Sequence, residues 1–152
     1  MLLGGPEDQA AVEPVRASVP RDRCIDLVGR EELIVAYAAL KRARLFVGND
    51  SGLMHLAAAA GAPTLGLFGP SDEALYAPWG ARARTVRGVR SFQEMNVGNP
   101  NFSHVICHMM DLQSSSVLAA ARSLLADTAP SGPAGAPAGE GAAPQVEECT
   151  GG

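Results

Sequence analysis

Several classes of protein are excluded by what this 152-residue sequence lacks. It has no window of about 18 apolar residues, the run that a membrane-spanning helix needs. Its three cysteines, Cys24, Cys107 and Cys149, are too few and too scattered for a disulfide framework. The first residues lack the basic region and the long apolar core of a secretory signal. These absences predict a soluble, cytoplasmic protein of a reducing compartment.

Positively charged residues are also fewer than negatively charged ones. The chain has 12 Lys and Arg against 16 Asp and Glu, which gives a formal net charge of −4 at pH 7. Nucleic-acid binding depends on neutralising phosphates, so we expect no nucleic-acid partner. Apolar residues make up 47 % of the chain, which is enough for a core, and the length predicts one folded domain.

The composition changes near residue 129. From Ala129 to Gly152 the chain has no Leu, Ile, Met or aromatic residue, and Ala, Gly and Pro dominate. Such a stretch buries too little apolar surface to offset the entropy lost on ordering. We therefore predict a folded domain over residues 1–128 and a disordered tail over 129–152. The tail is either simply solvated or a linker.

The folded part alternates short apolar runs with helical patterns. This alternation predicts an α/β fold, a Rossmann-like parallel sheet with helices on both faces. The opening Leu2-Leu3-Gly4-Gly5 has the pattern of the end of a strand, so we expect that the first part of the domain precedes this sequence. Residues 88–103 show no periodicity and are predicted to be a loop. Strands are predicted at 24–28, 45–47, 64–68 and 84–87, and helices from Pro6 onward and at 31–43, 51–60 and 114–126.

The most informative segment is 48–59, Gly-Asn-Asp-Ser-Gly-Leu-Met-His-Leu-Ala-Ala-Ala, which follows an apolar strand and begins a helix. Ligands of open α/β sheets bind at the carboxyl ends of strands, and free amides at a helix N-terminus bind anions. Asp50 and Ser51 can accept hydrogen bonds from such amides, and Gly52 allows a ligand close to the backbone. His55, one turn further on, can direct a ring nitrogen at the same anion. The segment predicts a phosphate or diphosphate site.

Simpler interpretations of this segment stay open. Asn-Asp-Ser-Gly is also an ordinary turn with a helix cap. His55, between Met54 and Leu56, also fits a buried histidine bonded to a carbonyl. A hydrolytic triad of Asp50, Ser51 and His55 is disfavoured, because the three crowd one helix end and lack the G-x-S-x-G elbow.

Two further clusters carry potential chemistry. An H-x-x-C-H pattern at 104–108 offers three zinc ligands but no matching second pair, so we favour packing within a loop over metal binding. A basic run near Trp79 is either a solvated strand face or a surface that attracts an anionic ligand. The run consists of Arg82, Arg84, Arg87 and Arg90.

Residues 48–59, with Pro63-Thr64 and Phe68-Gly69-Pro70-Ser71-Asp72 after them, resemble glycosyltransferase family 9, the ADP-heptose:lipopolysaccharide heptosyltransferases. The Leu-Met-His sequence at 53–55 resembles the heptosyltransferase II branch. Residues 3–7 resemble a strand-to-helix turn early in the family's C-terminal domain, and residues 107–117 resemble its closing segment. The resemblance extends over residues 1–126. It implies the C-terminal, sugar-nucleotide half of a two-domain B-type glycosyltransferase fold.

The resemblance also implies roles for single residues. Backbone amides in the 51–53 segment hold the donor diphosphate with support from His55, and Asp50 bonds sugar hydroxyls. Glu7 matches an acidic residue that bonds the nucleotide ribose, and the loop 29–31 lies beside the adenine. No cofactor is implied, because the donor ADP-heptose is a substrate and the family is metal-independent. The residues thus assigned to the donor site are Glu7, Glu31, Asp50, Ser51, Gly52, Leu53 and His55.

No catalytic residue of this chain is implied by the resemblance. In the family the base is an Asp of the N-terminal domain, which also holds the acceptor. The implied reaction is inverting transfer of heptose to the lipopolysaccharide inner core, at the cytoplasmic face of the inner membrane with peripheral membrane association. Ser71 stands where Thr is common and Glu73 where Pro is common. The alternative is a noncatalytic nucleotide-binding module, or a remnant fragment without the acceptor domain.

Overall fold

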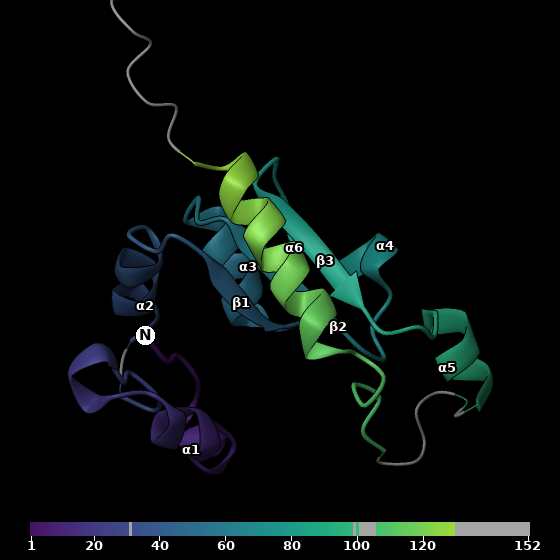
Figure 1. Ribbon diagram of the computed structural model, residues 1–152, viewed down its shortest axis with the longest axis horizontal. Helices are drawn as coiled ribbons and strands as arrows, with labels where there is room; N and C mark the ends of the chain where they lie inside the picture. The colour runs from purple at the N-terminus through teal and green to yellow at the C-terminus, as the bar shows by residue number, and fades with distance from the viewer. Residues whose placement is uncertain (31, 99, 101–105, 130–152) are drawn as a thin grey trace, which may run out of the picture.

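The computed structural model describes residues 1–30, 32–98, 100 and 106–129 (Figure 1). Glu31 and residues 130–152 of the tail predicted at 129–152 lie outside these ranges. The main elements are α1 (Gln9–Ser18), α2 (Leu33–Leu40), β1 (Phe46–Asn49), α3 (Gly52–Ala59), β2 (Thr64–Phe68), α4 (Glu73–Tyr76), β3 (Ala83–Arg87), α5 (Phe92–Gly98) and α6 (Ser114–Asp127). Short 3-10 turns lie at Pro6–Asp8 and Arg21–Arg23.

The strands form a parallel sheet in the order β1-β2-β3. Phe46 pairs with Thr64 at one end of the β1–β2 ladder, and Asn49 pairs with Leu67 at the other. β3 continues the same direction on the far side of β2. The α/β fold class predicted from the alternating pattern is therefore confirmed. All three carboxyl ends meet at one edge of the sheet.

Helices cover both faces of this sheet. Gly66 lies under α3, because a Cβ added there would be 2.6 Å from the Met54 sulfur. Its neighbour Leu67 points the other way and lines a cavity with Val117 of α6. Since successive strand residues face opposite sides, α3 and α6 pack on opposite faces, as Figure 1 shows. Fully buried side chains at the centre include Phe68, Leu40, Met54, Leu65, Leu124 and Val28.

The N-terminal segment forms a separate small strand pair. The Leu2 amide donates to the Ile25 carbonyl at 2.8 Å, and the Leu27 amide donates to the Leu2 carbonyl at 3.1 Å. Leu2 and Asp26 form a single parallel bridge. The strand predicted over 24–28 is thus reduced to one bridge, and Figure 1 shows this pair apart from the three-stranded sheet.

One prediction about local structure is wrong, and another holds over a shorter range. The segment predicted to be a loop at 88–103 contains α5, which begins with a capping box. The Ser91 amide donates to the Glu94 carboxylate at 2.7 Å, and the Glu94 amide donates to the Ser91 hydroxyl at 3.2 Å. The helix predicted at 31–43 is α2, which covers the shorter range Leu33–Leu40; its buried residues are Ala36 and Leu40, whereas Leu33 is 68 % exposed.

The helices in the described part of the chain are all too short or too polar to cross a bilayer.

Candidate functional site

The predicted site segment lies where β1 gives way to α3. The Asp50 amide donates to the Leu67 carbonyl at 3.3 Å, which extends the ladder one residue beyond β1. Ser51 is extended, with φ −161° and ψ 167°, and Gly52 is the first residue of α3. The backbone therefore turns directly from the end of a central strand into a helix N-terminus.

The first amides of α3 have no partner within the described residues. The Met54 and His55 amides both donate to the Ser51 carbonyl, at 3.1 and 3.4 Å. In the described part of the chain, no acceptor receives a hydrogen bond from the amides of Ser51, Gly52 or Leu53. These donors and the positive end of the helix dipole together form an anion-binding geometry.

Ser51 occupies the N-cap position of α3, as the interpretation of this turn as a helix cap expects, but the capping hydrogen bonds are not made. The Ser51 side chain makes no capping hydrogen bond. No hydrogen bond between the described residues joins the Asp50 carboxylate to a helix amide. Gly52 also faces open space, because a Cβ there would meet nothing within 4 Å. The helix start is consequently accessible from solvent.

His55 and Asp50 lie close together at this helix start. The His55 Nε2 is 3.9 Å from the Asp50 Oδ1, too far for a hydrogen bond. The His55 side chain is 49 % exposed and that of Asp50 is 20 % exposed, whereas Met54 is fully buried. The interpretation of His55 as a buried core histidine is therefore wrong. The His55 imidazole, as a donor, and the Asp50 carboxylate, as an acceptor, therefore remain available to a ligand beside the free amides.

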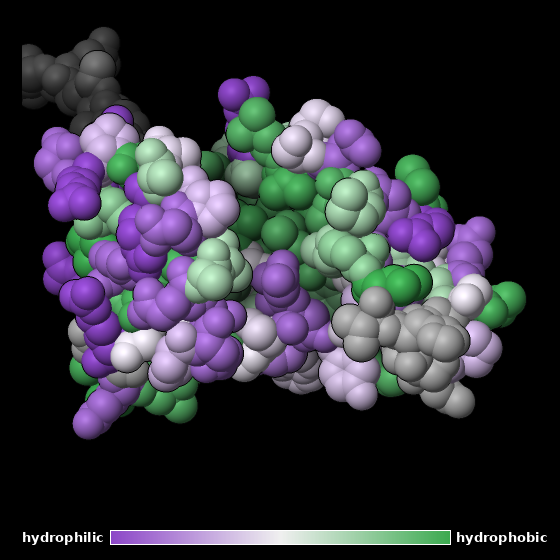
Figure 2. Space-filling model, turned by 90° about the horizontal axis from the view of Figure 1, so that it is seen from below, coloured by the Kyte–Doolittle hydropathy of each residue, from purple (hydrophilic) through white to green (hydrophobic). Residues whose placement is uncertain are grey.

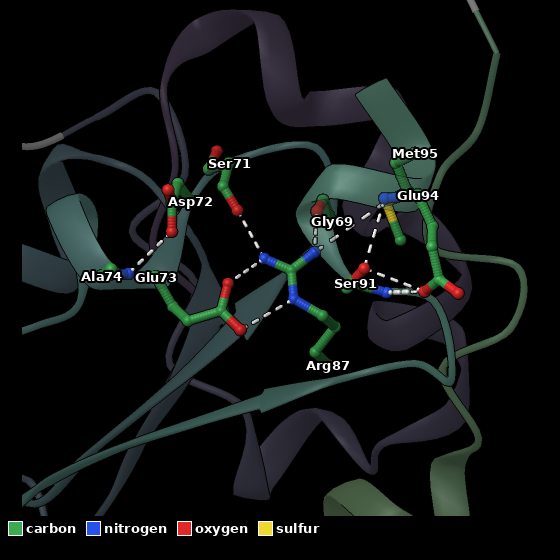
Figure 3. A network of polar contacts seen from close by, with 9 residues as sticks. All are labelled: Gly69, Ser71, Asp72, Glu73, Ala74, Arg87, Ser91, Glu94 and Met95. Carbon is green, nitrogen blue, oxygen red and sulfur yellow. Dashed lines mark hydrogen bonds and ion pairs between the residues drawn. The ribbon is translucent and has the colours of Figure 1, made fainter. Parts of the chain in front are cut away.

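A second loop leaves the same sheet edge after β2, and Arg87 at the end of β3 holds it in place (Figure 3). The Arg87 guanidinium donates to both carboxylate oxygens of Glu73 and to the backbone carbonyls of Gly69 and Ser71. Its side chain is only 10 % exposed. We refer to Arg87 with residues 69–73 as the arginine clamp.

Charge in the clamp is balanced locally. The hydrogen bonds from Arg87 hold the pKa of Glu73 below its ordinary value of 4.5. The Asp72 carboxylate accepts from the Ala74 amide at 2.9 Å and so caps α4. The loop after β2 thus has its polar groups paired internally, unlike the start of α3.

The basic run does not form one uniform surface. Arg90 pairs with Asp111 at 2.9 Å and Arg84 with Asp127 at 3.3 Å, while Arg82 donates to the Gly61 carbonyl at 3.1 Å. Arg87 is nearly buried in the clamp. The interpretation as a solvated strand face is therefore wrong for Arg87. All four arginines of the run donate to acceptors within the protein, and the charges of Arg84, Arg87 and Arg90 are paired with carboxylates rather than free to attract an anionic ligand.

The arginine clamp is the part of this region that the sequence did not reveal. Glu73 and Arg87 are 14 residues apart and have no helical or strand spacing in common. Parallel pairing brings them together, because Phe68 and Arg87 are register partners at the ends of β2 and β3. The sequence gives one signal for it, the Glu at position 73, where Pro is common and five residues after the end of β2.

The other predicted site residues are less closely connected. Glu7 lies exposed on the Pro6–Asp8 turn, and no hydrogen bond or ion pair of the described residues joins it to Asp50 or His55. Glu31 lies outside the described residues. In the H-x-x-C-H pattern Cys107 is exposed and His108 buried, and His104 is not described. The described residues contain no group of three or more potential ligands that could hold a metal ion.

A parallel sheet with helices on both faces and an open helix N-terminus at its carboxyl edge defines a Rossmann-like α/β protein with an anion-binding geometry. The family model of glycosyltransferase family 9 (heptosyltransferase) matches residues 1–103. The chain therefore belongs to glycosyltransferase family 9.

Individual relatives agree with this assignment. The chain is 34 % identical over 89 residues to lipooligosaccharide heptosyltransferase 2 of Haemophilus influenzae, covering 57 % of this chain and 26 % of that protein. It is 30 % identical over 102 residues to lipopolysaccharide heptosyltransferase 2 of Escherichia coli K12, covering 65 % and 29 %. The chain thus spans less than a third of the length of these relatives.

Solved structures show the same fold. A family 9 glycosyltransferase from Veillonella parvula superposes with a TM-score of 0.69 at 30 % identity, covering 83 % of this chain and 36 % of that one. An ADP-heptose lipopolysaccharide heptosyltransferase II of Escherichia coli superposes with a TM-score of 0.65 at 27 % identity and the same coverage. The Rossmann-like architecture is therefore confirmed.

Proposed function

We propose that this chain forms the donor-binding half of a heptosyltransferase and binds the diphosphate of ADP-heptose at the start of α3. The observation that carries the proposal is the set of free, accessible amides at Ser51, Gly52 and Leu53. The solved Escherichia coli neighbour, described as an ADP-heptose heptosyltransferase, supports the choice of donor. A diphosphate offers several anionic oxygens to such a cluster of donors.

Each residue of the site has a distinct role in this proposal. The amides and the helix dipole stabilise the charge that develops on departing ADP, without a metal ion or other cofactor. His55 donates to a phosphate oxygen, and Asp50 accepts hydrogen bonds from heptose hydroxyls. Glu7 and Glu31 serve the nucleotide end of the donor.

The other half of the reaction is proposed to lie outside residues 1–152. Inverting displacement needs a general base at the acceptor hydroxyl, a contribution of about 10²–10⁴-fold, together with a bound acceptor. We propose that a second domain supplies both and presents the lipopolysaccharide inner core. The reaction is then placed at the cytoplasmic face of the inner membrane, with peripheral association.

The donor proposal is tested by calorimetric titration of the chain with ADP, AMP and adenosine. ADP is expected to bind most tightly, because only its diphosphate spans the free amides. Gly52→Pro is the informative variant: it removes one amide, while proline is well tolerated at the first position of a helix. Gly52→Ala is the matched control, since it keeps the amide and its Cβ meets open space.

Loss of one charge-assisted hydrogen bond predicts about a tenfold or larger fall in ADP affinity for Gly52→Pro. Gly52→Ala is expected to stay within about twofold of the original chain. Equal affinities for ADP and adenosine, or equal losses in both variants, would contradict a diphosphate at this helix.

Catalysis is tested separately with ADP-heptose and a heptose-deficient core acceptor. We expect no detectable transfer by residues 1–152 alone and measurable transfer when a family 9 acceptor domain is supplied. ADP binding without transfer in either case would favour the noncatalytic nucleotide-binding module. Robust transfer by the chain alone would place the base within residues 1–152 and contradict the division of roles.

A further inference from the structure

The segments that precede the strands carry a cluster of positive charge. The starts of β1, β2 and β3 are register partners, so the segments before them meet at the amino edge of the sheet. The Thr64 amide donates to the Arg82 carbonyl at 2.9 Å, which holds Arg82 at this edge. Three more basic residues come just before β1. We refer to the four residues together as the basic edge: Lys41, Arg42, Arg44 and Arg82.

The charges of the basic edge are exposed and are not balanced nearby. All four residues are exposed, and none of them forms an ion pair with another described residue. Arg82 donates to the Gly61 carbonyl at 3.1 Å, an acceptor without a formal charge. The Lys41 ammonium lies 6.0 Å from the centre of the Tyr37 ring, which is also uncharged. The adjoining segments 38–45, 59–63 and 77–83 contain no Asp or Glu.

The carboxyl edge of the sheet has the opposite charge. Five carboxylates lie on the segments that follow the strands, those of Asp50, Asp72, Glu73, Glu94 and Asp111. Figure 2 shows the face to which the carboxyl end of β3 points, where hydrophilic residues lie beside a hollow with hydrophobic residues at its bottom. A partner that binds the basic edge therefore lies on the side of the sheet away from the candidate donor site.

The described part of the chain ends beside the basic edge. α6 ends at Asp127, whose carboxylate lies 3.3 Å from the guanidinium of Arg84 near the start of β3. Figure 1 shows the last turn of α6 beside the start of this strand. The segment 130–152 then follows, with three glutamates and no Lys or Arg. A segment whose charges are all negative thus begins next to a cluster whose charges are all positive.

This segment is long enough for its carboxylates to reach the basic edge. Glu140 lies 13 residues beyond Asp127, and an extended chain of that length spans about 45 Å. The starts of β1 and β3 are two strand spacings apart, which is about 10 Å. Carboxylates on so short a tether have an effective concentration of the order of 1 mM beside the basic edge.

We propose that the segment 130–152 docks on the basic edge of its own chain through Glu140, Glu147 and Glu148. The contact consists of exposed ion pairs, so it is weak, exchanges between partners and depends on salt. It covers the positive charge of the amino edge and leaves the start of α3 open. The inference needs no nucleotide, so its outcome is independent of the proposed donor function.

The segment has two advantages over other anionic occupants of this surface. A separate polyanion has to approach a chain whose net charge is −4 and displace three tethered carboxylates. The same segment of a second copy offers identical charges, but only at the concentration of the protein. Below about 1 mM protein the tethered segment therefore binds in preference.

Paramagnetic relaxation in NMR spectra of the complete chain tests the contact. A nitroxide is attached to Cys149, after Cys24→Ser and Cys107→Ser have removed the other two thiols. The matched variant carries glutamine at the three glutamates of the segment, which keeps the length and the label and removes the charge. Broadening is measured for amides of the basic edge and, as a reference at the other edge of the sheet, for Ser51 and Gly52.

At about 0.01 M salt, where charges act over about 30 Å, we expect the amides of the basic edge to be broadened at least about twofold more in the original chain than in the glutamine variant. At about 1 M salt, where charges act over about 3 Å, the difference is expected to vanish. The two reference amides are expected to be the same in both chains. Equal broadening of the basic edge at low salt, or a difference that persists at high salt, would overturn the proposal.

Two single substitutions locate the docking surface. Arg42→Gln removes one charge of the basic edge, and Arg30→Gln removes the same charge before the start of α2. Only Arg42→Gln is expected to reduce the broadening, and equal effects of the two would contradict the assignment. In a mixture, an isotope-labelled chain without nitroxide is expected to stay unaffected by nitroxide-labelled copies. Broadening in this mixture equal to that within one chain would mean that a second copy occupies the edge, which also contradicts the proposal.

Discussion

The loops after β1 and after β2 leave the same sheet edge but satisfy their polar groups in opposite ways. In the loop after β2 the acceptors are paired within the protein, since Arg87 donates hydrogen bonds to two backbone carbonyls and to the Glu73 carboxylate. The loop after β1 leaves its helix amides open and its Asp50 uncommitted to a cap. The difference teaches that the closed loop can give the open loop rigid surroundings, which free donors need if they are to bind a ligand well.

The largest expected effect comes from breaking the closed loop. Arg87→Ala leaves two carbonyls and a carboxylate without their shared donor, and we expect it to lower the free energy of unfolding by about 2–3 kcal/mol. Chemical denaturation measures this loss. Arg84→Ala is the matched control, because the Arg84–Asp127 pair is about half exposed and is expected to contribute less than about 0.5 kcal/mol. Equal effects of the two substitutions would show that the clamp does not hold the loop.

An effect of intermediate size on stability is expected to distinguish Asp72, which follows β2, from Asp50, which follows β1. Asp72→Ala removes the cap on Ala74 and is expected to destabilise the protein by about 1 kcal/mol. Asp50→Ala removes no cap and is expected to change stability by less than about 0.5 kcal/mol, while it weakens ADP-heptose binding. Thermal melts with and without ADP-heptose measure both. A larger stability loss for Asp50→Ala than for Asp72→Ala would reverse the comparison.

The smallest expected effect is the response of the clamp to acid. The folded-state pKa of Glu73 lies below its ordinary value of 4.5, so the carboxylate stabilises the fold above that pH. This contribution is lost as pH falls through the lowered pKa, where Glu73 becomes protonated in the folded state too. Solvent screening keeps the effect small, because the Glu73 side chain is 41 % exposed.

Denaturation midpoints measured from about pH 6 to about pH 3 test this sign. The original chain is expected to lose more stability on acidification than Glu73→Gln, so that the two curves converge at low pH. Parallel curves over the whole range would mean that the Arg87–Glu73 pair does not contribute to folding.

Local patterns were sufficient for most of the sheet and for placing the candidate site segment between a strand and a helix. The strand at Thr64–Phe68 follows directly from its apolar run between Pro63 and Gly69, and the helix after Asp50 follows from the alanine-rich pattern. Asp50 to His55 could be singled out because strand, turn and helix start are contiguous in sequence. Their contact with a donor stays a prediction.

What the sequence did not reveal depends on contacts between distant residues or on a signal that was overlooked. The arginine clamp exists only because parallel pairing brings Arg87 beside the β2 loop. The α5 helix carried a local Ser91–Glu94 capping box that periodicity alone did not detect. In α2 nearly every position is apolar, so the pattern could not distinguish buried Ala36 from exposed Leu33.

β1 is an edge strand of the three-stranded sheet, and its outer edge affects how this polypeptide behaves at high concentration. An apolar strand with free backbone groups is a template for any other extended chain, including a second copy in the course of folding. Val47 is 42 % exposed on that edge, with no charged residue or proline in β1 to discourage such pairing. Residues 1–152 are therefore expected to self-associate increasingly as concentration rises.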